Sequence, residues 1–336
     1  MQLPPLATTG IGSLPRPRWL GKTNHTRVEF GLAEEALQEA CDDATILALR
    51  LQEKLGIDLV TDGEQRREGF IFHIAGKWSG IDTKTLGQKE MYRKRVRQTM
   101  VPRVIAKVTR REPAAVADTL FAKANTDRPL KMAVPGPMTV VDSSLNQFYK
   151  DEAELAMDIA VALNQELLEM QAAGCDVLQI DEPAMTRYHD KLRDYGANAL
   201  DRCLEGIKVP TLVHLCYGYP GTGMPQHEYE YSGVLPELMK TRISGFTVEF
   251  GRSAFDPAVL EMCGDRIVVY GCVDPGASPA PDVASVARRV ATVLKHLSPQ
   301  QVWLSPDCGL MTIDRALAEQ KLAVLAEAAR VLRRGL

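Results

Sequence analysis

The sequence predicts an α/β fold, a single (β/α)8 TIM barrel with an insertion after its second strand. Two observations predict it: eight short apolar runs occur along the chain, and amphipathic helical segments lie between them. Strand, loop and helix repeated in this order indicate parallel strands joined by crossover helices. Eight such units close a barrel, and a barrel builds its active site from the loops that follow the strands.

The strand candidates are distributed over the whole chain. Each is short, rich in β-branched, aromatic or other apolar residues, and followed by loop residues. In chain order they cover residues 8–11, 58–61, 130–134, 175–180, 209–214, 245–249, 266–270 and 302–305.

Helices are predicted where apolar residues recur every three or four positions. The clearest covers residues 151–173, in which Leu155, Ile159, Leu163, Leu167 and Met170 share one face. Similar patterns predict helices over about residues 32–55, 283–297 and 318–332. Each of these segments follows a strand candidate, and all but the last precede another.

One stretch, residues 63–128, is too long for an ordinary loop between a strand and a helix. We expect an inserted hairpin and helix within a single domain 1–336, because no change of composition marks a linker. The alternating run 100–108 predicts a strand there. The insertion is also basic, and two interpretations stay open: a solvated hairpin, or a surface for an acidic donor or a partner protein. The basic residues are Arg93, Lys94, Arg95, Arg97, Arg103, Lys107, Arg110 and Arg111.

Composition excludes several classes of protein. The chain has 336 residues with 40 Lys and Arg against 43 Asp and Glu, a net charge of −3, so no overall positive field favours nucleic acid. Its 7 cysteines are odd in number and scattered, which favours reduced thiols over a disulfide framework. Neither a signal-peptide pattern nor a long apolar run occurs. We therefore expect a soluble, cytoplasmic protein with no nucleic-acid or membrane partner.

Four residues near strand ends form a candidate metal site. His214 and Cys216 are two positions apart, so their side chains point to the same face of a strand. Glu249 ends the sixth strand, where an unpaired buried carboxylate would be costly, and Cys308 follows the eighth. Two thiolates, an imidazole and a carboxylate favour Zn2+ over magnesium or calcium. Because a carboxylate is the weakest of these ligands, the site suits activation of an incoming thiol.

Seven segments, in order along the whole chain, resemble the cobalamin-independent methionine synthase family, specifically its catalytic C-terminal barrel. They are residues 9–15 (TGIGSLP), 62–66 (DGEQR), 136–139 (GPMT), 179–184 (QIDEPA), 214–218 (HLCYG), 247–253 (TVEFGRS) and 305–310 (SPDCGL). The resemblance implies the same four zinc ligands. It also implies that homocysteine is held by Ile11, Gly12, Ser13, Glu64 and Asp181. An α-amino acid needs donors for its carboxylate and acceptors for its ammonium, which these residues supply.

The function that the resemblance implies is a zinc-dependent methyltransferase that moves a methyl group to the thiol of homocysteine and gives methionine. The reaction would be a direct displacement, with much of its rate coming from the proximity of two bound small-molecule substrates. The fold implied is the barrel that the strand count also predicts.

Three features depart from the folate-using members of this family. The chain has no room for their N-terminal half, lacks a Trp at residues 141–144, and has no His in residues 271–279 (GCVDPGASP) to protonate a departing nitrogen. Because general acid help is typically worth about 10²- to 10⁴-fold, its loss favours a donor that needs no proton. We therefore expect a short core form that uses methylcobalamin or a corrinoid protein, with Asp274 as a substitute catalytic acid if the donor is a folate.

Three different functions remain open from the sequence. The first is that of a related zinc-dependent alkyltransferase acting on another thiol, of coenzyme M type, which would not need Glu64 and Asp181. The second is that of a metal-free decarboxylase of uroporphyrinogen type, which would bind no zinc and would line its cleft with Arg. The third is that of a non-catalytic zinc-binding barrel whose basic insertion binds another polypeptide.

Overall fold

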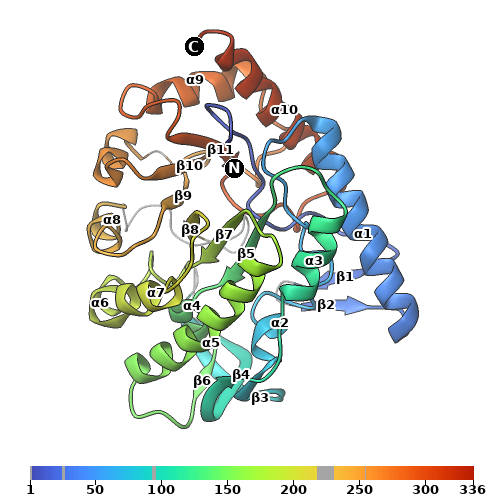
Figure 1. The fold of residues 1–336 in the computed structure, drawn as a ribbon, viewed down its shortest axis with the longest axis vertical. Coiled ribbons are helices and arrows are strands. Elements are labelled where there is room, and N and C mark those ends of the chain that lie inside the picture. The colour runs from blue at the N-terminus through green and yellow to red at the C-terminus, as the bar shows by residue number, and fades with distance from the viewer. Residues whose placement is uncertain (1, 25–26, 93–95, 218–230, 254) are drawn as a thin grey trace.

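Parallel strands form the centre of the molecule. The computed structural model describes residues 2–24, 27–92, 96–217, 231–253 and 255–336. Its main sheet has six parallel strands in the order β11-β10-β9-β8-β7-β5, with helices around them (Figure 1). The strands are β5 (Lys131–Pro135), β7 (Val177–Asp181), β8 (Thr211–Leu215), β9 (Gly245–Glu249), β10 (Ile267–Val273) and β11 (Val302–Pro306).

Two further segments close this sheet into a barrel. Thr8 bridges to Leu304 of β11, and Thr9 bridges to Leu59, all in the parallel sense. Val60 bridges to Leu130, the residue immediately before β5, which completes the circle. The eight predicted strands are therefore confirmed, although the first two are reduced to isolated bridges. The reason is that the chain turns into the loops 10–16 and 61–71 after two consecutive paired residues in each segment, and a further bridge joins Ser13 to Gly63 within these loops.

The helices cover the outside of the barrel in chain order. The long ones are α1 (Glu34–Leu55), α5 (Glu152–Ala172), α9 (Val283–Val293) and α10 (Arg315–Arg333), close to the predicted ranges. Aspartate side chains begin three of them, at Asp151, Asp282 and Asp314, by accepting backbone N–H groups of the first turn. Shorter helical segments are α2 (Phe72–Ala75), α3 (Val116–Ala124), α4 (Pro137–Asp142), α6 (His189–Lys191), the π-helix η1 (Leu192–Gly196), α7 (Ala197–Cys203), η2 (Tyr231–Gly233), α8 (Leu235–Leu238) and η3 (Pro257–Cys263).

Most of the buried apolar residues belong to an outer or an inner group. Residues facing the helices belong to one large core between helices and sheet. The inner group fills the part of the barrel away from the carboxyl ends of its strands. It consists of Ala7, Leu59, Val177, Leu212, Val269 and Trp303. Because side chains alternate along a strand, residues two and four positions further on share this inner face. Val177, Gln179 and Asp181 therefore lead from the apolar floor to the carboxyl end of the barrel, where the site residues gather.

The segment between the second and third barrel strands contains a long antiparallel hairpin. Its strands are β3 (Trp78–Tyr92) and β4 (Val96–Arg110), followed by α3. The alternating run 100–108 is confirmed as part of β4. A third strand, β6 (Leu145–Asn146), joins the hairpin from the loop after α4, outside the expected insertion. In Figure 1 this sheet lies at the opposite end of the view from α9 and α10.

A smaller hairpin, β1 (Gly21–Asn24) and β2 (Arg27–Phe30), precedes α1. Among the described residues, no helix has the length and apolar character needed to cross a membrane. All seven cysteines are buried, and none forms a disulfide in the structure.

Candidate metal centre and substrate site

Four potential ligand atoms meet at the carboxyl end of the barrel. His214 lies near the end of β8, and Cys216 is the first residue after this strand. Glu249 is the last residue of β9, and Cys308 lies in the loop after β11. One ligand atom from each lies within 4.8 Å of the other three, and all four side chains are buried. The two sulfur atoms are 3.4 Å apart. Residues distant in the sequence thus form one compact donor set, because parallel strands end at the same edge.

The hydrogen bonds around this group leave suitable atoms directed at its centre. Nδ1 of His214 lies 3.2 Å from Oδ1 of Asp181, so the carboxylate occupies one ring nitrogen. Nε2 of His214 and Oε1 of Glu249 are buried and have no hydrogen-bond partner among the described atoms. A metal-bound histidine characteristically pairs its other nitrogen with a carboxylate in this way. The donor set therefore fits a divalent cation, and its two sulfurs fit zinc.

The charge balance also favours a cation. Burial, together with the nearby Cys216 sulfur, raises the pKa of Glu249 well above its ordinary value. The neighbouring Cys308 sulfur and burial raise the pKa of the Cys216 thiol. Burial opposes protonation of His214, but Asp181 and Cys216 outweigh it and raise its pKa to about 10. Because metal ligands must be deprotonated, a bound cation would reverse these shifts and stabilise all the donors together.

Two buried side chains align the strands that carry the ligands. The hydroxyl of Tyr231 accepts the Glu249 N–H at 2.7 Å and donates to the Leu215 carbonyl at 3.2 Å, joining the ends of β9 and β8. The carboxylate of Asp307 accepts the backbone N–H groups of residues 251 and 252 at 2.6 and 2.7 Å. The loop after Glu249 is thus held against the loop that carries Cys308.

The residues expected to hold an amino acid lie beside this centre. The carbonyl of Ser13 accepts the Leu310 N–H at 2.9 Å, which places the segment 11–13 next to the Cys308 loop. A Cβ on Gly12 would lie 2.4 Å from Oε1 of Glu64, so glycine is required for this carboxylate to approach the backbone. The structure therefore brings Ile11, Gly12, Ser13, Glu64 and Asp181 to the same end of the barrel as the metal ligands.

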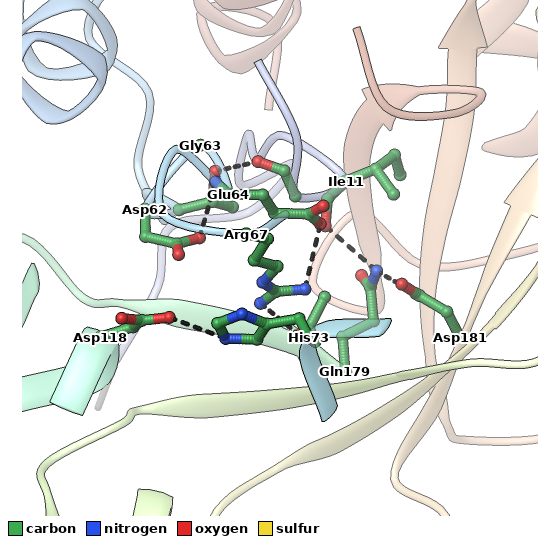
Figure 2. Close-up of polar contacts among 12 residues, drawn as sticks. Ile11, Asp62, Gly63, Glu64, Arg67, His73, Asp118, Gln179 and Asp181 are labelled. Atoms are coloured by element: carbon green, nitrogen blue, oxygen red, sulfur yellow. Dashed lines mark hydrogen bonds and ion pairs between the residues drawn. The ribbon is translucent and has the colours of Figure 1, made fainter. Parts of the chain in front are cut away.

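The conformation of Glu64 is strained and supported by neighbours. Its φ of 54° is in the left-handed region, which costs a non-glycine residue about 1–3 kcal/mol and is often associated with function. The N–H of Glu64 donates to Asp62 at 3.1 Å, and Nη1 of Arg67 lies 3.5 Å from Oε1 of Glu64 (Figure 2). Nη2 of Arg67 donates to the Ala133 carbonyl at 2.6 Å. Burial raises the pKa of Glu64.

Asp274 follows β10, between the strands that lead to Glu249 and Cys308. It is partly buried, and its Oδ1 accepts the Gly276 N–H at 2.7 Å. The Asp274 carbonyl accepts a hydrogen bond from Nζ of Lys321 at 2.6 Å. The loop is therefore well supported, and one carboxylate oxygen is committed to it.

Sequence reasoning assigned no role to two inward residues, Gln179 and Lys131. Gln179 lies within the segment QIDEPA, two positions before Asp181, so the alternation of side chains could have shown that it faces the site. Its Nε2 donates to Asp181 at 2.7 Å and to the Ile11 carbonyl at 3.1 Å (Figure 2). Lys131 gave no such signal, because a lysine at the start of a strand usually extends into solvent.

Glu182 has a structural role at the same rim. It accepts hydrogen bonds from the N–H groups of Met138 and Thr139 at 2.9 and 2.8 Å, in the first turn of α4. Glu182 therefore satisfies backbone N–H groups at the start of α4. Glycine is required at position 136, because a Cβ there would lie 2.3 Å from the Glu182 carboxyl group.

The basic residues named above for the insertion lie near carboxylates of the same chain wherever their side chains are described. Arg103 pairs with Asp82 at 2.7 Å, and Arg110 pairs with Glu166 at 2.8 Å. Lys107 and Arg111 also lie near carboxylates, at 3.9 and 2.8 Å. The side chains of residues 93–95 and 97 lie outside the described part of the structure. The described members thus resemble a solvated hairpin more than an unpaired basic surface.

The fold and this site define a (β/α)8-barrel protein with a buried centre of two thiols, one imidazole and one carboxylate. Comparisons with known proteins extend this description. Residues 6–331 match the family described as "Cobalamin-independent synthase, Catalytic domain". The chain is 31% identical over 338 residues to a methionine synthase of Sulfurisphaera tokodaii, covering 99% of this chain and 94% of that protein.

A methionine synthase of Saccharolobus solfataricus is 33% identical over 344 residues, covering 99% of this chain and 96% of that protein. Among solved structures, a B12-independent methionine synthase from a Shewanella species, in complex with selenomethionine, has a TM-score of 0.94 at 31% identity, covering 98% of each chain. The chain belongs to the cobalamin-independent methionine synthase family, as its catalytic barrel. This membership confirms the predicted fold and the prediction of a methyltransferase of the methionine synthase type.

Proposed function

We propose that the protein transfers a methyl group to the thiol of homocysteine, giving methionine, at a zinc ion held by His214, Cys216, Glu249 and Cys308. The observation that carries this proposal is the convergence of these four buried donors within 4.8 Å beside Asp181. The relatives that are named methionine synthases support the choice of substrate. A bound zinc ion would ionise the substrate thiol, worth up to about 30-fold at pH 7 for a thiol of ordinary pKa.

The protein's own residues would bind and orient the amino acid. Glu64 and Asp181 offer carboxylates to its ammonium, while backbone N–H groups of the segment 11–13 approach its carboxylate. The strained backbone at Glu64 holds its carboxylate against Gly12 in advance of binding. Holding the sulfur and the methyl donor in line supplies much of the rate. The new S–CH3 bond forms as the donor–CH3 bond breaks, and the bonding electron pair leaves with the donor.

The test of the metal proposal is metal content and X-ray absorption at the zinc edge. We expect one zinc per chain, with two sulfur ligands that become three when homocysteine is added. Cys308→Ser is expected to lose stoichiometric zinc, whereas Cys263→Ser, a buried thiol outside the site, is the matched control and is expected to keep it. Protein purified without zinc that also fails to take it up would contradict the proposal, and would suit a metal-free decarboxylase.

X-ray absorption also distinguishes homocysteine methylation from two further functions. A structural zinc ion in a non-catalytic barrel would show no change in sulfur coordination with homocysteine. An alkyltransferase for another thiol would show the change with a coenzyme M type thiol and not with homocysteine. The acceptors Glu64 and Asp181 favour an amino acid over such a thiol.

The methyl donor is tested separately. The family is described as cobalamin-independent, which gives no support to a corrinoid protein as partner. For a folate donor we propose Asp274 as the group that protonates the departing nitrogen, since it follows β10 on the same rim. Turnover of homocysteine should then be faster with methyltetrahydrofolate than with methylcobalamin, and Asp274→Asn should lower only the folate rate. Faster turnover with methylcobalamin, unaffected by Asp274→Asn, would contradict this proposal and indicate a corrinoid methyl donor.

A further inference from the structure

Lys131 places an ammonium group inside the barrel. It begins β5 and is fully buried, and its register partner in β7 is Val177 of the inner apolar group. Its Nζ donates to Oε1 of Gln179 at 2.7 Å. A charge in such a position is costly unless its surroundings compensate for it. Burial lowers the pKa of Lys131 to about 7, while the carboxylates of Asp181 and Glu64 act in the opposite direction.

The partner of Lys131 leads directly to the metal centre. Nε2 of Gln179 donates to Oδ1 of Asp181 at 2.7 Å, and the same oxygen lies 3.2 Å from Nδ1 of His214. Three consecutive contacts therefore connect the ammonium of Lys131 to the imidazole of the metal centre. Nε2 of Gln179 also donates to the Ile11 carbonyl at 3.1 Å, so the amide reaches the segment expected to bind the substrate carboxylate.

The chemistry of the amide explains why a lysine is needed at the start of this connection. A glutamine side chain has one accepting end and one donating end, whereas an ammonium group can only donate. In its protonated form Lys131 is therefore compatible only with the orientation in which the oxygen of Gln179 faces it. In the reversed orientation the oxygen would face the Asp181 carboxylate, and two donors would face each other at Lys131.

We propose that Lys131 is a positioning residue of this site: it fixes the amide orientation of Gln179, which in turn holds Asp181 against His214 and binds the Ile11 carbonyl. The inference rests on the proposed function, because it assigns Lys131 an effect on zinc and homocysteine binding. It differs from a role in charge balance alone, in which Lys131 would offset Glu64 and Asp181 without acting through Gln179.

A double-mutant cycle separates these roles. The variants are Lys131→Met, Gln179→Leu and the double variant, and zinc affinity is measured by competition with a chromophoric chelator. Each single variant should bind zinc about 10- to 100-fold more weakly, as for other residues that support metal ligands. The zinc affinity of the double variant should lie within about threefold of that of the weaker-binding single variant. The reason is that the effects of two residues that act through one another are not additive. The KM for homocysteine should rise about tenfold in Lys131→Met, with a smaller change in kcat.

The matched control is Asn164→Leu. Asn164 is also a buried polar residue, and its Nδ2 donates to the carbonyls of Cys203 and Glu205 outside the barrel. This variant should lower the unfolding temperature and leave zinc affinity unchanged, which shows that lost stability alone does not weaken the site. If Lys131→Met is insoluble, Lys131→Gln, which is shorter and uncharged, replaces it under the same criteria.

The outcomes are distinguishable. Parent-like zinc affinity and KM in Lys131→Met, with zinc bound normally by the parent protein, would overturn this inference and leave the proposed function standing. Full additivity of the two substitutions would also overturn it, in favour of charge balance. Absence of zinc binding by the parent protein would overturn both.

Discussion

Nδ1 of His214 faces Oδ1 of Asp181 at 3.2 Å, and this contact connects the candidate metal centre to the candidate amino-acid site. It selects the ring nitrogen that remains available, Nε2, which is buried without a partner among the described atoms. The same carboxylate also accepts the amide of Gln179. Asp181 is therefore shared by the metal ligand, the expected substrate ammonium and the polar interior of the barrel.

Asp181→Asn should weaken zinc binding about 10- to 100-fold, because an amide cannot match a carboxylate in orienting the imidazole. It should also raise the KM for homocysteine, since the ammonium loses a charged acceptor. A chelator competition assay measures the first effect and steady-state kinetics the second. Asp201→Asn, which breaks an exposed ion pair with Arg242, is the matched control and should change neither. Parent-like zinc affinity in Asp181→Asn would refute the assigned role.

Gly12→Ala should impair homocysteine binding while zinc remains stoichiometric. The added Cβ would lie 2.4 Å from Oε1 of Glu64, so the carboxylate must move. Overpacking of this kind costs about 1–3 kcal/mol, and here we expect it to appear as a higher KM. Gly31→Ala serves as control because nothing lies within 4 Å of its added Cβ. An unchanged KM in Gly12→Ala would mean that Glu64 does not contact the substrate.

Tyr231→Phe and Tyr149→Phe form a matched pair. Each hydroxyl accepts one backbone N–H and donates to one oxygen, so each loss should cost about 1–3 kcal/mol of unfolding free energy. Tyr231 joins β8 and β9, which carry metal ligands, whereas Tyr149 joins the hairpin to α5. Urea unfolding should show both losses, and only Tyr231→Phe should also weaken zinc binding. Equal zinc affinities in the two variants would show that strand alignment does not control the centre.

Glu182 makes stability depend on pH in an unusual direction. Burial raises its pKa to about 7 from an ordinary 4.5, so the folded state holds the proton more tightly than the unfolded chain does. Its contribution to stability is greatest below the unfolded pKa and falls as pH rises through the folded pKa. Relative to Glu182→Gln, the parent protein should therefore lose unfolding free energy between about pH 5 and pH 7.5.

Glu169 supplies the opposite sign as a control. Its exposed carboxylate has a pKa lowered by a hydrogen bond from Arg110, so its stabilising effect is present above the ordinary pKa and is lost as pH falls. Chemical denaturation of the parent, Glu182→Gln and Glu169→Gln from about pH 3 to about pH 7.5 checks both signs, since the effect of Glu169 is lost below its ordinary pKa and that of Glu182 above its own. A parent protein that gains stability over Glu182→Gln as pH rises would contradict the assignment.

Much of the architecture was predictable because the pattern of apolar residues along the sequence indicates which side chains are buried. The apolar runs that became β5 and β7 to β9 are buried throughout, and such runs indicate the interior strands of a parallel sheet. The short paired lengths at Thr9 and Leu59 were not predictable, since the sequence pattern continues into residues that leave the sheet. The pairing of β6 with β4 of the hairpin was likewise not predictable from local sequence patterns, because it depends on a contact between distant segments.

The sequence by itself determined which chemical groups reach the carboxyl end of the barrel. Parallel strands end at one edge of the sheet, so a potential metal ligand at or just after a strand end is already placed at that end of the barrel. His214, Glu249 and Cys308 are examples. Only the tertiary structure decided how those groups face one another. The direction of the His214 ring, the amide orientation of Gln179 and the inward position of Lys131 depend on the register between neighbouring strands. That register is set by closure of the whole barrel and is encoded in no single segment.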